Sequence, residues 1–499
     1  MKLKSLVGHL NEIYNIVNSW EKPVDVELKK YYRSRKYLGS NDRKFISNNL
    51  YSIIRNHRLI IHIAEKHFSH LTDINYFDKL FFINCRLSGG RSTSGLIPRL
   101  VNSAKIEPQN GRGLECDENL VDDRTKLRTM NYQLPATNEG LECDKSISDY
   151  INEIFPKSDE LTSLIEEELN LVSNNICLKY SFPDWMINKF AKIISDQEME
   201  NFLASLNMNA PTTIRIADKT FEQSIKKDFE DKSILLSEDP IAPDAFIVEK
   251  RINFNDFASY KDGYFEVQDA GSQIVTLFVE PSGLKTDGNI KILDACAGAG
   301  GKSLYLSKLI NKKSLVYAYD FDQKRLDAFK KRMSEKQMRE KRIATKHGIN
   351  IKPLISNGII KFVNSEDELQ TLKNKIDLLV LDVPCTGIGT IRRNPDLKWR
   401  LKEEDVLMYV KKQLSILETY SSYLKEGGRL IYITCSFFKE ENEDVITHFL
   451  NKEPKFKLDD KTNFSREYSM ELENSFLRLY PHRHTTDGFT ACQLFNSYF

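Results

Sequence analysis

The sequence predicts an α/β protein whose main domain is a parallel sheet with helices on both faces. The first observation is residues 376–381, an almost wholly apolar run of the kind that forms a strand buried on both faces. The second is an apolar strand at 291–295 that runs through a glycine-rich turn into a helix. The third is the alternation of helical segments with strands at 315–319, 359–364 and 429–434, an order typical of parallel sheets.

The bulk composition indicates a soluble protein of several domains. With 499 residues the chain is too long for one hydrophobic core. Hydrophobic residues make up 40% and charged residues 29%, and the net charge is +1, so any nucleic-acid surface must be a local patch. No apolar run approaches the ~20 residues that span a membrane, and the first residues lack the apolar core of a signal peptide. The eight cysteines are scattered without metal-ligand spacing, which predicts free thiols in a reducing cytoplasm and no metal site.

We expect four regions along the chain, with boundaries at changes in periodicity and composition. Residues 1–85 are predicted to be helical, and their many lysines and arginines fit either a solvated face or contact with an RNA backbone. Residues 86–157 lack periodicity and are predicted to be an irregular insertion or linker. Residues 158–265 are predicted to be a small α/β module, ahead of the main domain at 266–499. The elements expected in this module are helices at 158–171, 183–194, 196–206 and 219–227 and strands at 213–216 and 246–248.

The glycine-rich turn at 296–303 is a candidate ligand site. Its residues, Cys-Ala-Gly-Ala-Gly-Gly-Lys-Ser, would let the backbone approach a ligand at the N-terminus of the next helix. Such a unit opens both dinucleotide-binding and S-adenosylmethionine-binding folds, although the G-x-G-x-x-G and P-loop patterns are absent. The next strand ends at Asp320, which can accept hydrogen bonds from both hydroxyls of a ribose or else cap the following helix. That helix, 323–346, carries ten basic residues against three acids, which fits a solvated face or a phosphate-facing surface.

Two further strands each end in a cysteine. The strand at 376–381 leads into Asp382-Val383-Pro384-Cys385, and Pro384 must end the strand because it has no N–H to donate. The strand at 429–434 leads into Cys435, and the acids at 440–443 are expected to open the following helix. Taken alone, Asp382 and Cys385 fit two interpretations equally well: a functional site, or a strand that ends in a loop with an inert buried cysteine. If the two strands are neighbours, however, both thiols emerge at the ligand edge, which suggests covalent catalysis.

A thiol, an acid and a cofactor turn together suit one chemical problem, the methylation of cytosine at carbon 5. That carbon is too poor a nucleophile to accept a methyl group directly. A thiolate that adds to carbon 6 makes carbon 5 nucleophilic, and a base later removes the proton from carbon 5 as the thiolate leaves. An acid such as Asp382 can bind the exocyclic amine and the ring nitrogen as charge develops.

Seven segments of the chain resemble the RsmB/Sun/Nop-type RNA (cytosine-5) methyltransferases, in the family's order over residues 180–499. They are residues 181–189, 267–273, 294–303, 320–326, 382–399, 427–442 and 487–489. The most specific are the run from Asp382 to Asp396 and the sequence Thr434-Cys435-Ser436 followed by Glu-Glu-Asn. The resemblance implies a Rossmann-like S-adenosylmethionine-dependent methyltransferase sheet, with an RNA-recognition-like module at 158–265 and an N-terminal helical region.

The resemblance also implies roles for single residues. Cys435 would be the nucleophile and Cys385 would assist release of the methylated RNA, although DNA cytosine methyltransferases attack with the Pro-Cys thiol, so both assignments stay open. The residues expected to contact the cofactor are Cys296, Ala297, Gly298, Ala299, Gly300, Gly301, Lys302, Asp320, Asn364 and Asp382. Ala299 stands where the family usually has proline, and either Asn364 or Ser365 would contact the adenine.

The sequence therefore predicts a cytoplasmic, monomeric enzyme that transfers a methyl group from S-adenosylmethionine to carbon 5 of cytosine in RNA, with small-subunit ribosomal RNA as the expected substrate. No metal and no membrane contact are expected. The alternatives are a tRNA cytosine-5 methyltransferase and a catalytically weak RNA-binding factor of ribosome assembly. A nicotinamide-dependent oxidoreductase is disfavoured by the missing G-x-G-x-x-G pattern and by the paired strand-end cysteines.

Overall fold

The chain forms two compact units, Met1–Ser181 and Phe182–Phe499. The computed structural model describes residues 1–88, 143–250, 252–280, 289–347, 359–460, 462–468, 470 and 472–497. Most of the segment predicted to be irregular, 86–157, therefore lies outside the described residues. Its last part forms helix α7 (Cys143–Ile154), which the sequence analysis did not predict. The helix is explained by two apolar side chains at helical spacing, Ile151 and Phe155, which are both buried.

The first unit is helical, as predicted for residues 1–85. Its elements are α1 (Leu3–Val17), α2 (Val24–Ser34), α3 (Ser40–Arg55), α4 (His57–His67), α5 (Tyr76–Leu87), α7, α8 (Ser158–Leu171), η2 (Val172–Asn174) and α9 (Ile176–Lys179). Helix α8 joins this unit because its buried Glu168 accepts hydrogen bonds from His62 and His67 of α4, each at 2.8 Å, and pairs with Lys66 at 2.7 Å. The division at Ser181 thus falls inside the stretch 158–265 that the sequence analysis treated as one module.

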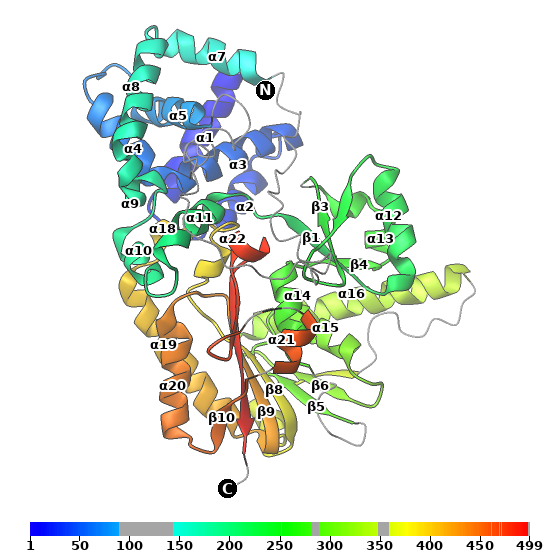
Figure 1. Ribbon diagram of the computed structural model, residues 1–499. Coiled ribbons are helices and arrows are strands. Elements are labelled where there is room, and N and C mark those ends of the chain that lie inside the picture. Colours follow the sequence, from blue (N-terminus) through cyan, green and yellow to red (C-terminus); the bar gives the residue numbers. More distant parts are fainter. Residues whose placement is uncertain are drawn as a thin grey trace, which may run out of the picture. The chain divides into compact units, whose positions relative to one another are not determined.

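The second unit begins with two helices and a small antiparallel sheet. The elements are α10 (Asp184–Phe190), α11 (Asp196–Asn207), β1 (Thr212–Ile216), η3 (Lys219–Phe221), α12 (Glu222–Glu230), β2 (Leu236–Glu238), β3 (Ala245–Val248), η4 (Phe254–Asp256), α13 (Ala258–Lys261) and β4 (Phe265–Val267). The strand order is β2-β3-β1-β4, and every pair is antiparallel. Ile225 and Phe229 of α12 pack on Ile214 and Phe265 of the strands. Figure 1 shows α12 and α13 beside this sheet.

The main sheet has nine strands in the order β11-β12-β13-β9-β8-β5-β6-β7, with β10 paired to β13. The strands are β5 (Lys291–Asp294), β6 (Leu315–Ala318), β7 (Ile359–Phe362), β8 (Ile376–Asp382), β9 (Leu424–Thr434), β10 (Phe456–Leu458), β11 (Leu472–Glu473), β12 (Phe476–Leu479) and β13 (Phe489–Asn496). The five strands from β5 to β9 are parallel, as predicted. The sheet as a whole is mixed, because the C-terminal strands, which the sequence analysis did not predict, add to β9 in antiparallel pairs.

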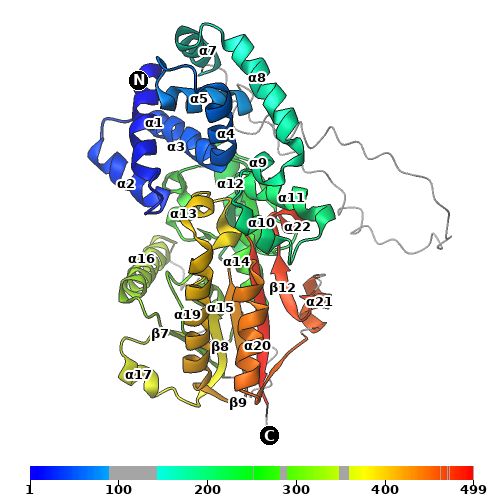
Figure 2. The same ribbon diagram turned by 90° about the vertical axis from the view of Figure 1, so that its left-hand side faces the viewer.

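Helices cover both faces of the main sheet. The helices after the small sheet are α14 (Ala270–Leu277), α15 (Gly301–Leu309), α16 (Gln323–His347), α17 (Glu366–Gln370), α18 (Leu397–Arg400), α19 (Glu403–Ser421), α20 (Glu443–Lys452), α21 (Thr462–Tyr468) and α22 (Pro481–His484), with the short turns η6 (Ile388–Thr390) and η7 (Lys439–Glu441). Successive residues of β5 point to opposite faces: Ile292 packs with Tyr305 of α15, and Leu293 with Leu417 of α19. Figure 2 shows α19 and α20 side by side on one of these faces. None of the helices described is both long and apolar enough to cross a membrane.

Candidate active site

The two strand-end thiols meet at the carboxyl edge of the parallel strands. Strands β8 and β9 are neighbours, as the sequence analysis required, and Asp382 lies opposite Ile433 in their register. The loops that follow these strands bring Cys385 Sγ to 3.1 Å from Cys435 Sγ. The pKa of the Cys385 thiol lies well above its usual range because of its hydrogen bond with Cys435 and because of burial. Cys385 is therefore a neutral thiol at physiological pH.

A charged pair lies at the same edge of the sheet. Lys302 Nζ, from the first turn of α15, donates a hydrogen bond of 2.6 Å to Asp382 Oδ2 at the end of β8. Burial alone would lower the pKa of Lys302, but the charge of Asp382 and this hydrogen bond raise it, and Cys435 adds to the effect. The ammonium is thus kept charged close to Cys435. Its other neighbour is the ring of Phe489, whose centroid lies 5.4 Å away.

The glycine-rich turn has room for a ligand where its backbone is most open. Gly298 and Gly300 have φ values of +53° and +81°, in the region that favours glycine. A Cβ on Gly300 would lie 2.1 Å from the Phe329 ring, whereas a Cβ on Gly298 would have no atom within 4 Å. The turn is therefore tightly packed on the protein side and open at Gly298, which fits the close approach of a cofactor to the backbone.

Asp320 is fixed beside this turn. Its two carboxylate oxygens accept hydrogen bonds from the backbone N–H groups of Gly298, at 2.7 Å, and Asp322, at 2.8 Å. Each oxygen of an ionised carboxylate can accept a second hydrogen bond, so Asp320 keeps capacity for the two hydroxyls of a ribose. The acceptor oxygens of Asp320 and the open backbone at Gly298 together fit the ribose and backbone contacts of S-adenosylmethionine.

The remaining residues predicted for the cofactor site differ in where they lie. Ala297 is buried, with its N–H bonded to Tyr319 O at 3.0 Å, and burial raises the pKa of the Cys296 thiol well above its usual range. Asn364 is exposed beyond β7, and its hydrogen bonds go to Glu368 and to Phe362 O. No three histidine, cysteine or acidic side chains of the described ranges gather in a way that could hold a metal ion.

Two buried acids at this edge were missed by sequence reasoning. Asp294, the last residue of β5, accepts a hydrogen bond of 2.5 Å from Ser303 Oγ, and burial raises its pKa to about 7. Glu441 was expected to open a helix, but α20 begins at Glu443, and the Glu441 carboxylate is instead fully buried between the two cysteine loops. The only sequence signal was the position of each acid, one at a strand end and one shortly after a strand-end thiol.

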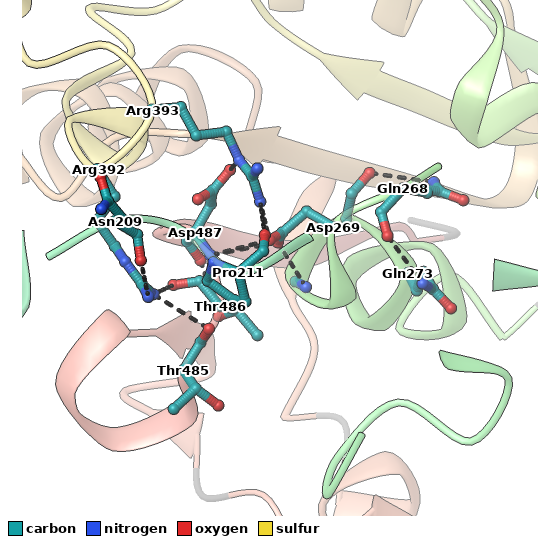
Figure 3. A network of polar contacts seen from close by, with 12 residues as sticks. Asn209, Pro211, Gln268, Asp269, Gln273, Arg392, Arg393, Thr485, Thr486 and Asp487 are labelled. Carbon is teal, nitrogen blue, oxygen red and sulfur yellow. Dashed lines mark hydrogen bonds and ion pairs between the residues drawn. The ribbon is translucent and has the colours of Figure 1, made fainter. Parts of the chain in front are cut away.

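An arginine pair connects the loop after Cys385 to three other segments, at 209–211, at Asp269 and at 485–487 (Figure 3). Arg393 donates from Nε to Asp487 Oδ2 at 2.6 Å and from Nη2 to Asp269 Oδ2 at 2.8 Å. Arg392 donates to the backbone carbonyls of Thr485 at 3.1 Å and Thr486 at 3.2 Å. The segment before β13 and the N-terminus of α14 are thereby tied to the loop after Cys385.

Gly389, in the loop after Cys385, connects the same segment to the loop of the second thiol through its backbone. Gly488 N donates to Gly389 O at 2.8 Å, and Gly389 N donates to Cys435 O at 2.9 Å. A Cβ on Gly389 would lie 2.3 Å from Gly488 O, so only glycine allows this approach. Three loops distant in sequence therefore close on one another around the thiols.

Comparison with known proteins shows which family this part of the chain resembles. The family model described as 16S rRNA methyltransferase RsmB/F matches residues 282–495, which span the turn, both thiols and the Lys302–Asp382 pair. This match confirms the predicted resemblance to the RsmB/Sun/Nop family. The matched domain is that of an S-adenosylmethionine-dependent methyltransferase, so the predicted enzyme class and cofactor are confirmed.

The curated proteins that this chain resembles include bacterial and human proteins. It is 28% identical over 333 residues to the "Probable ribosomal RNA small subunit methyltransferase B" of Coxiella burnetii, covering 66% of this chain and 72% of that protein. It is 25% identical over 340 residues to the human "28S rRNA (cytosine(4447)-C(5))-methyltransferase", covering 65% of this chain and 39% of that protein.

Solved structures confirm the predicted fold class. The crystal structure of PH0851 aligns with a TM-score of 0.62 and 22% identity over 98% of each chain. The structure of NSun6 from Pyrococcus horikoshii aligns with a TM-score of 0.50 and 17% identity over 64% of this chain and 99% of that chain. At such identities the likeness concerns the fold, which is that of S-adenosylmethionine-dependent methyltransferases.

Proposed function

We propose that this chain transfers a methyl group from S-adenosylmethionine to carbon 5 of a cytosine in ribosomal RNA of the small subunit. The observation that carries the proposal is the pair of thiols 3.1 Å apart beside the charged Lys302–Asp382 pair. Direct methylation of an oxygen or nitrogen would need no thiol, whereas methylation of the cytosine ring at carbon 5 does. The bacterial and human relatives are named for methylation of ribosomal RNA, the human one at carbon 5 of cytosine, which supports the same substrate here.

Cys435 is the nucleophile in this proposal. Its thiolate forms a bond to carbon 6 of cytosine, and the electron pair of the 5,6 double bond becomes available at carbon 5. S-adenosylmethionine supplies the methyl group that carbon 5 takes up. A general base takes the proton from carbon 5, the electron pair of that C–H bond restores the 5,6 double bond, and the Cys435 thiolate is expelled from carbon 6. Cys385 assists the release of the methylated RNA.

Asp382 and Lys302 bind and orient the base. The Asp382 carboxylate is a third exposed and can accept a hydrogen bond from the exocyclic amine of cytosine. Lys302 holds that carboxylate in place through its hydrogen bond to Oδ2. The cofactor would be held by residues 296–302 and by Asp320, with Asn364 or Ser365 near its adenine.

The proposal extends to the rest of the chain. The predicted module at 158–265 would help to bind RNA, and the basic residues of the N-terminal helices would contact its backbone. The target cytosine must leave its stack or lie in a loop to reach the thiols. The enzyme would work in the cytoplasm as a monomer.

Trapping of the covalent intermediate tests this function. The Cys385→Ala protein is incubated with S-adenosylmethionine and total RNA, and a protein–RNA band is sought on a denaturing gel. We expect a band that disappears when Cys435 is also changed to alanine, and sequencing of the trapped RNA then identifies the substrate and the cytosine.

Two results would overturn parts of the proposal. If the band persists in the double variant, Cys435 is not the nucleophile. If the unmutated protein binds both the cofactor and RNA but transfers no methyl group to any cytosine, the proposed activity is wrong. Trapped tRNA in place of ribosomal RNA would reject the substrate and keep the chemistry.

A further inference from the structure

We propose that Glu441 is a positioning residue that sets the separation and orientation of the Cys385 and Cys435 thiols through hydrogen bonds to both cysteine loops. This inference rests on the proposed function, because it gives a reason why the two thiols lie in contact. Glu441 itself touches neither sulfur, and it acts through the residues that follow the cysteines.

The Glu441 carboxylate accepts hydrogen bonds from the residue after each cysteine. Thr386, next to Cys385, donates from its backbone N–H to Oε1 at 2.9 Å and from its hydroxyl to Oε2 at 2.5 Å. Ser436, next to Cys435, donates from its hydroxyl to Oε2. Thr386, Ser436 and Glu441 are all buried, so these bonds are shielded from competing water. One carboxylate thus links the two loops directly beneath the thiols.

A second contact holds the loop on the other side of Cys385. Gln413 of α19 donates from Nε2 to Glu441 Oε1 at 3.0 Å and to the carbonyl of Pro384 at 3.1 Å. The backbone of Glu441 is anchored to β9, since the hydroxyl of Tyr432 donates to Glu441 O at 2.7 Å. Residues on both sides of Cys385 are therefore tied to a carboxylate whose own position is fixed by the strand that leads to Cys435.

The hydrogen-bond donors around Glu441 make it possible to test the position of its side chain separately from its charge. Four donors fill the acceptor positions of the carboxylate, two on each oxygen. Glutamine has the same length, and its carbonyl oxygen could replace Oε1, because the two donors there are N–H groups. Its NH₂ group could replace Oε2, because the hydroxyls of Thr386 and Ser436 can rotate and accept. Glu441→Gln therefore removes the charge and keeps the bridge.

Aspartate provides the opposite change. Glu441→Asp keeps the charge, but the side chain is one methylene shorter and cannot reach both loops. If positioning is what Glu441 does, Glu441→Gln should keep most of the single-turnover rate of methyl transfer, whereas Glu441→Asp should lose about 100-fold, as expected for reacting groups displaced by about 1 Å. A role for the charge itself predicts the reverse order of the two variants.

Glu440 offers a matched control in the same turn. Its carboxylate accepts a hydrogen bond from Lys189 at 2.8 Å and lies apart from the cysteine loops in the contacts described. Glu440→Asp should leave the rate within about twofold of the unmutated protein, because this partly buried carboxylate pairs with Lys189 and Lys192 and, among the residues described, not with either cysteine loop. S-adenosylmethionine affinity, measured by calorimetry on all three variants, should stay unchanged, which shows that each remains folded.

A second readout follows the thiols without reference to methylation. Diamide oxidises two thiols to a disulfide: one S–S bond forms, both thiol protons leave, and diamide takes up two electrons and two protons. The rate of the Cys385–Cys435 disulfide is followed by peptide mass spectrometry and divided by the rate at which iodoacetamide alkylates each thiol. We expect this ratio to fall in Glu441→Asp and to stay near the value of the unmutated protein in Glu441→Gln.

The outcomes are distinct. The inference is overturned if Glu441→Asp keeps the rate and the disulfide ratio, or if Glu441→Gln loses both as fully as Glu441→Asp does. Absence of RNA methylation by the unmutated protein would instead overturn the proposed function, and the disulfide ratio would still decide whether Glu441 positions the thiols.

Discussion

Lys302 and Asp382 form a hydrogen-bonded ion pair of 2.6 Å although they lie 80 residues apart in the sequence. The lysine comes from the first turn of α15, the helix that follows the glycine-rich turn, and the aspartate from the end of β8, the strand that leads to Cys385. The pair therefore connects the predicted cofactor turn to the predicted site of the base, and a change on one side should be felt on the other.

Lys302→Met should leave the Asp382 carboxylate without the cation that holds it. We expect methyl transfer to fall by about 100-fold, since removal of one preorganised polar group from an active site commonly has this effect. The rate is measured in single turnover at saturating S-adenosylmethionine. Lys312→Met, an exposed change in the turn after α15, is the control. A Lys302→Met enzyme with the rate of this control would show that the pair is dispensable.

Gly298→Ala tests whether the open side of the turn faces the cofactor. Alanine at a φ of +53° costs about 1 kcal/mol of stability, and its methyl group meets no protein atom within 4 Å. S-adenosylmethionine affinity, measured by calorimetry, should nevertheless fall, because the methyl group would occupy the space the cofactor needs. Gly263→Ala has φ +74° and equally open surroundings, so it should show a similar stability cost and unchanged affinity. Equal affinities in both variants would place the cofactor elsewhere.

The raised pKa of Asp294 should make stability depend on pH. Burial raises this pKa to about 7 in the folded protein, so between its ordinary value and pH 7 the folded state binds more protons than the unfolded state. The contribution of the protonated carboxyl is therefore present at low pH and is lost as the pH rises through about 7. Asp294→Asn should remove this loss and gain stability over the unmutated protein at pH 8 more than at pH 5, as measured by urea unfolding without cofactor. A difference that does not vary with pH would contradict the assignment.

Arg393→Met should leave two buried carboxylates facing each other. Burial and the charge of Asp269 raise the pKa of Asp487 to about 6, and Arg393 opposes this rise. Without the arginine the folded pKa rises further, so we expect a stability loss of about 2 to 3 kcal/mol that grows as the pH rises above 6. Chemical unfolding at pH 5 and pH 8 measures it. The double variant Arg393→Met, Asp487→Asn should recover much of the loss, and a simple sum of the single effects would argue against the bridge.

The parts of the fold that were predictable are those in which one local pattern leaves few alternatives. An apolar run such as 376–381 can be buried only as a strand with cover on both faces, and β8 has this position in the structure. The strand-end thiols could be placed together in advance because the carboxyl ends of neighbouring parallel strands share one edge.

The missed parts depend on partners that are remote in sequence. Strands β12 and β13 become part of the main sheet only because β12 pairs with β13 and β13 pairs with β9. Helix α8 was grouped with the following module because nothing local shows that Glu168 pairs with side chains of α4. The two acids missed at the site, Asp294 and Glu441, are buried by segments that are remote in sequence. Their own neighbours in sequence therefore do not show that they are buried.

The sequence by itself determined the chemistry available to this protein: two strand-end thiols, an acid, a lysine and a glycine-rich turn, each at a position that periodicity and turn residues dictate locally. Only the tertiary structure decided which of these groups touch. The 3.1 Å contact of Cys385 with Cys435, the ion pair of Lys302 with Asp382 and the link through Glu441 all join separate segments. Such contacts depend on the packing of strands and helices into one sheet, where burial removes water and gives each polar group a single set of partners.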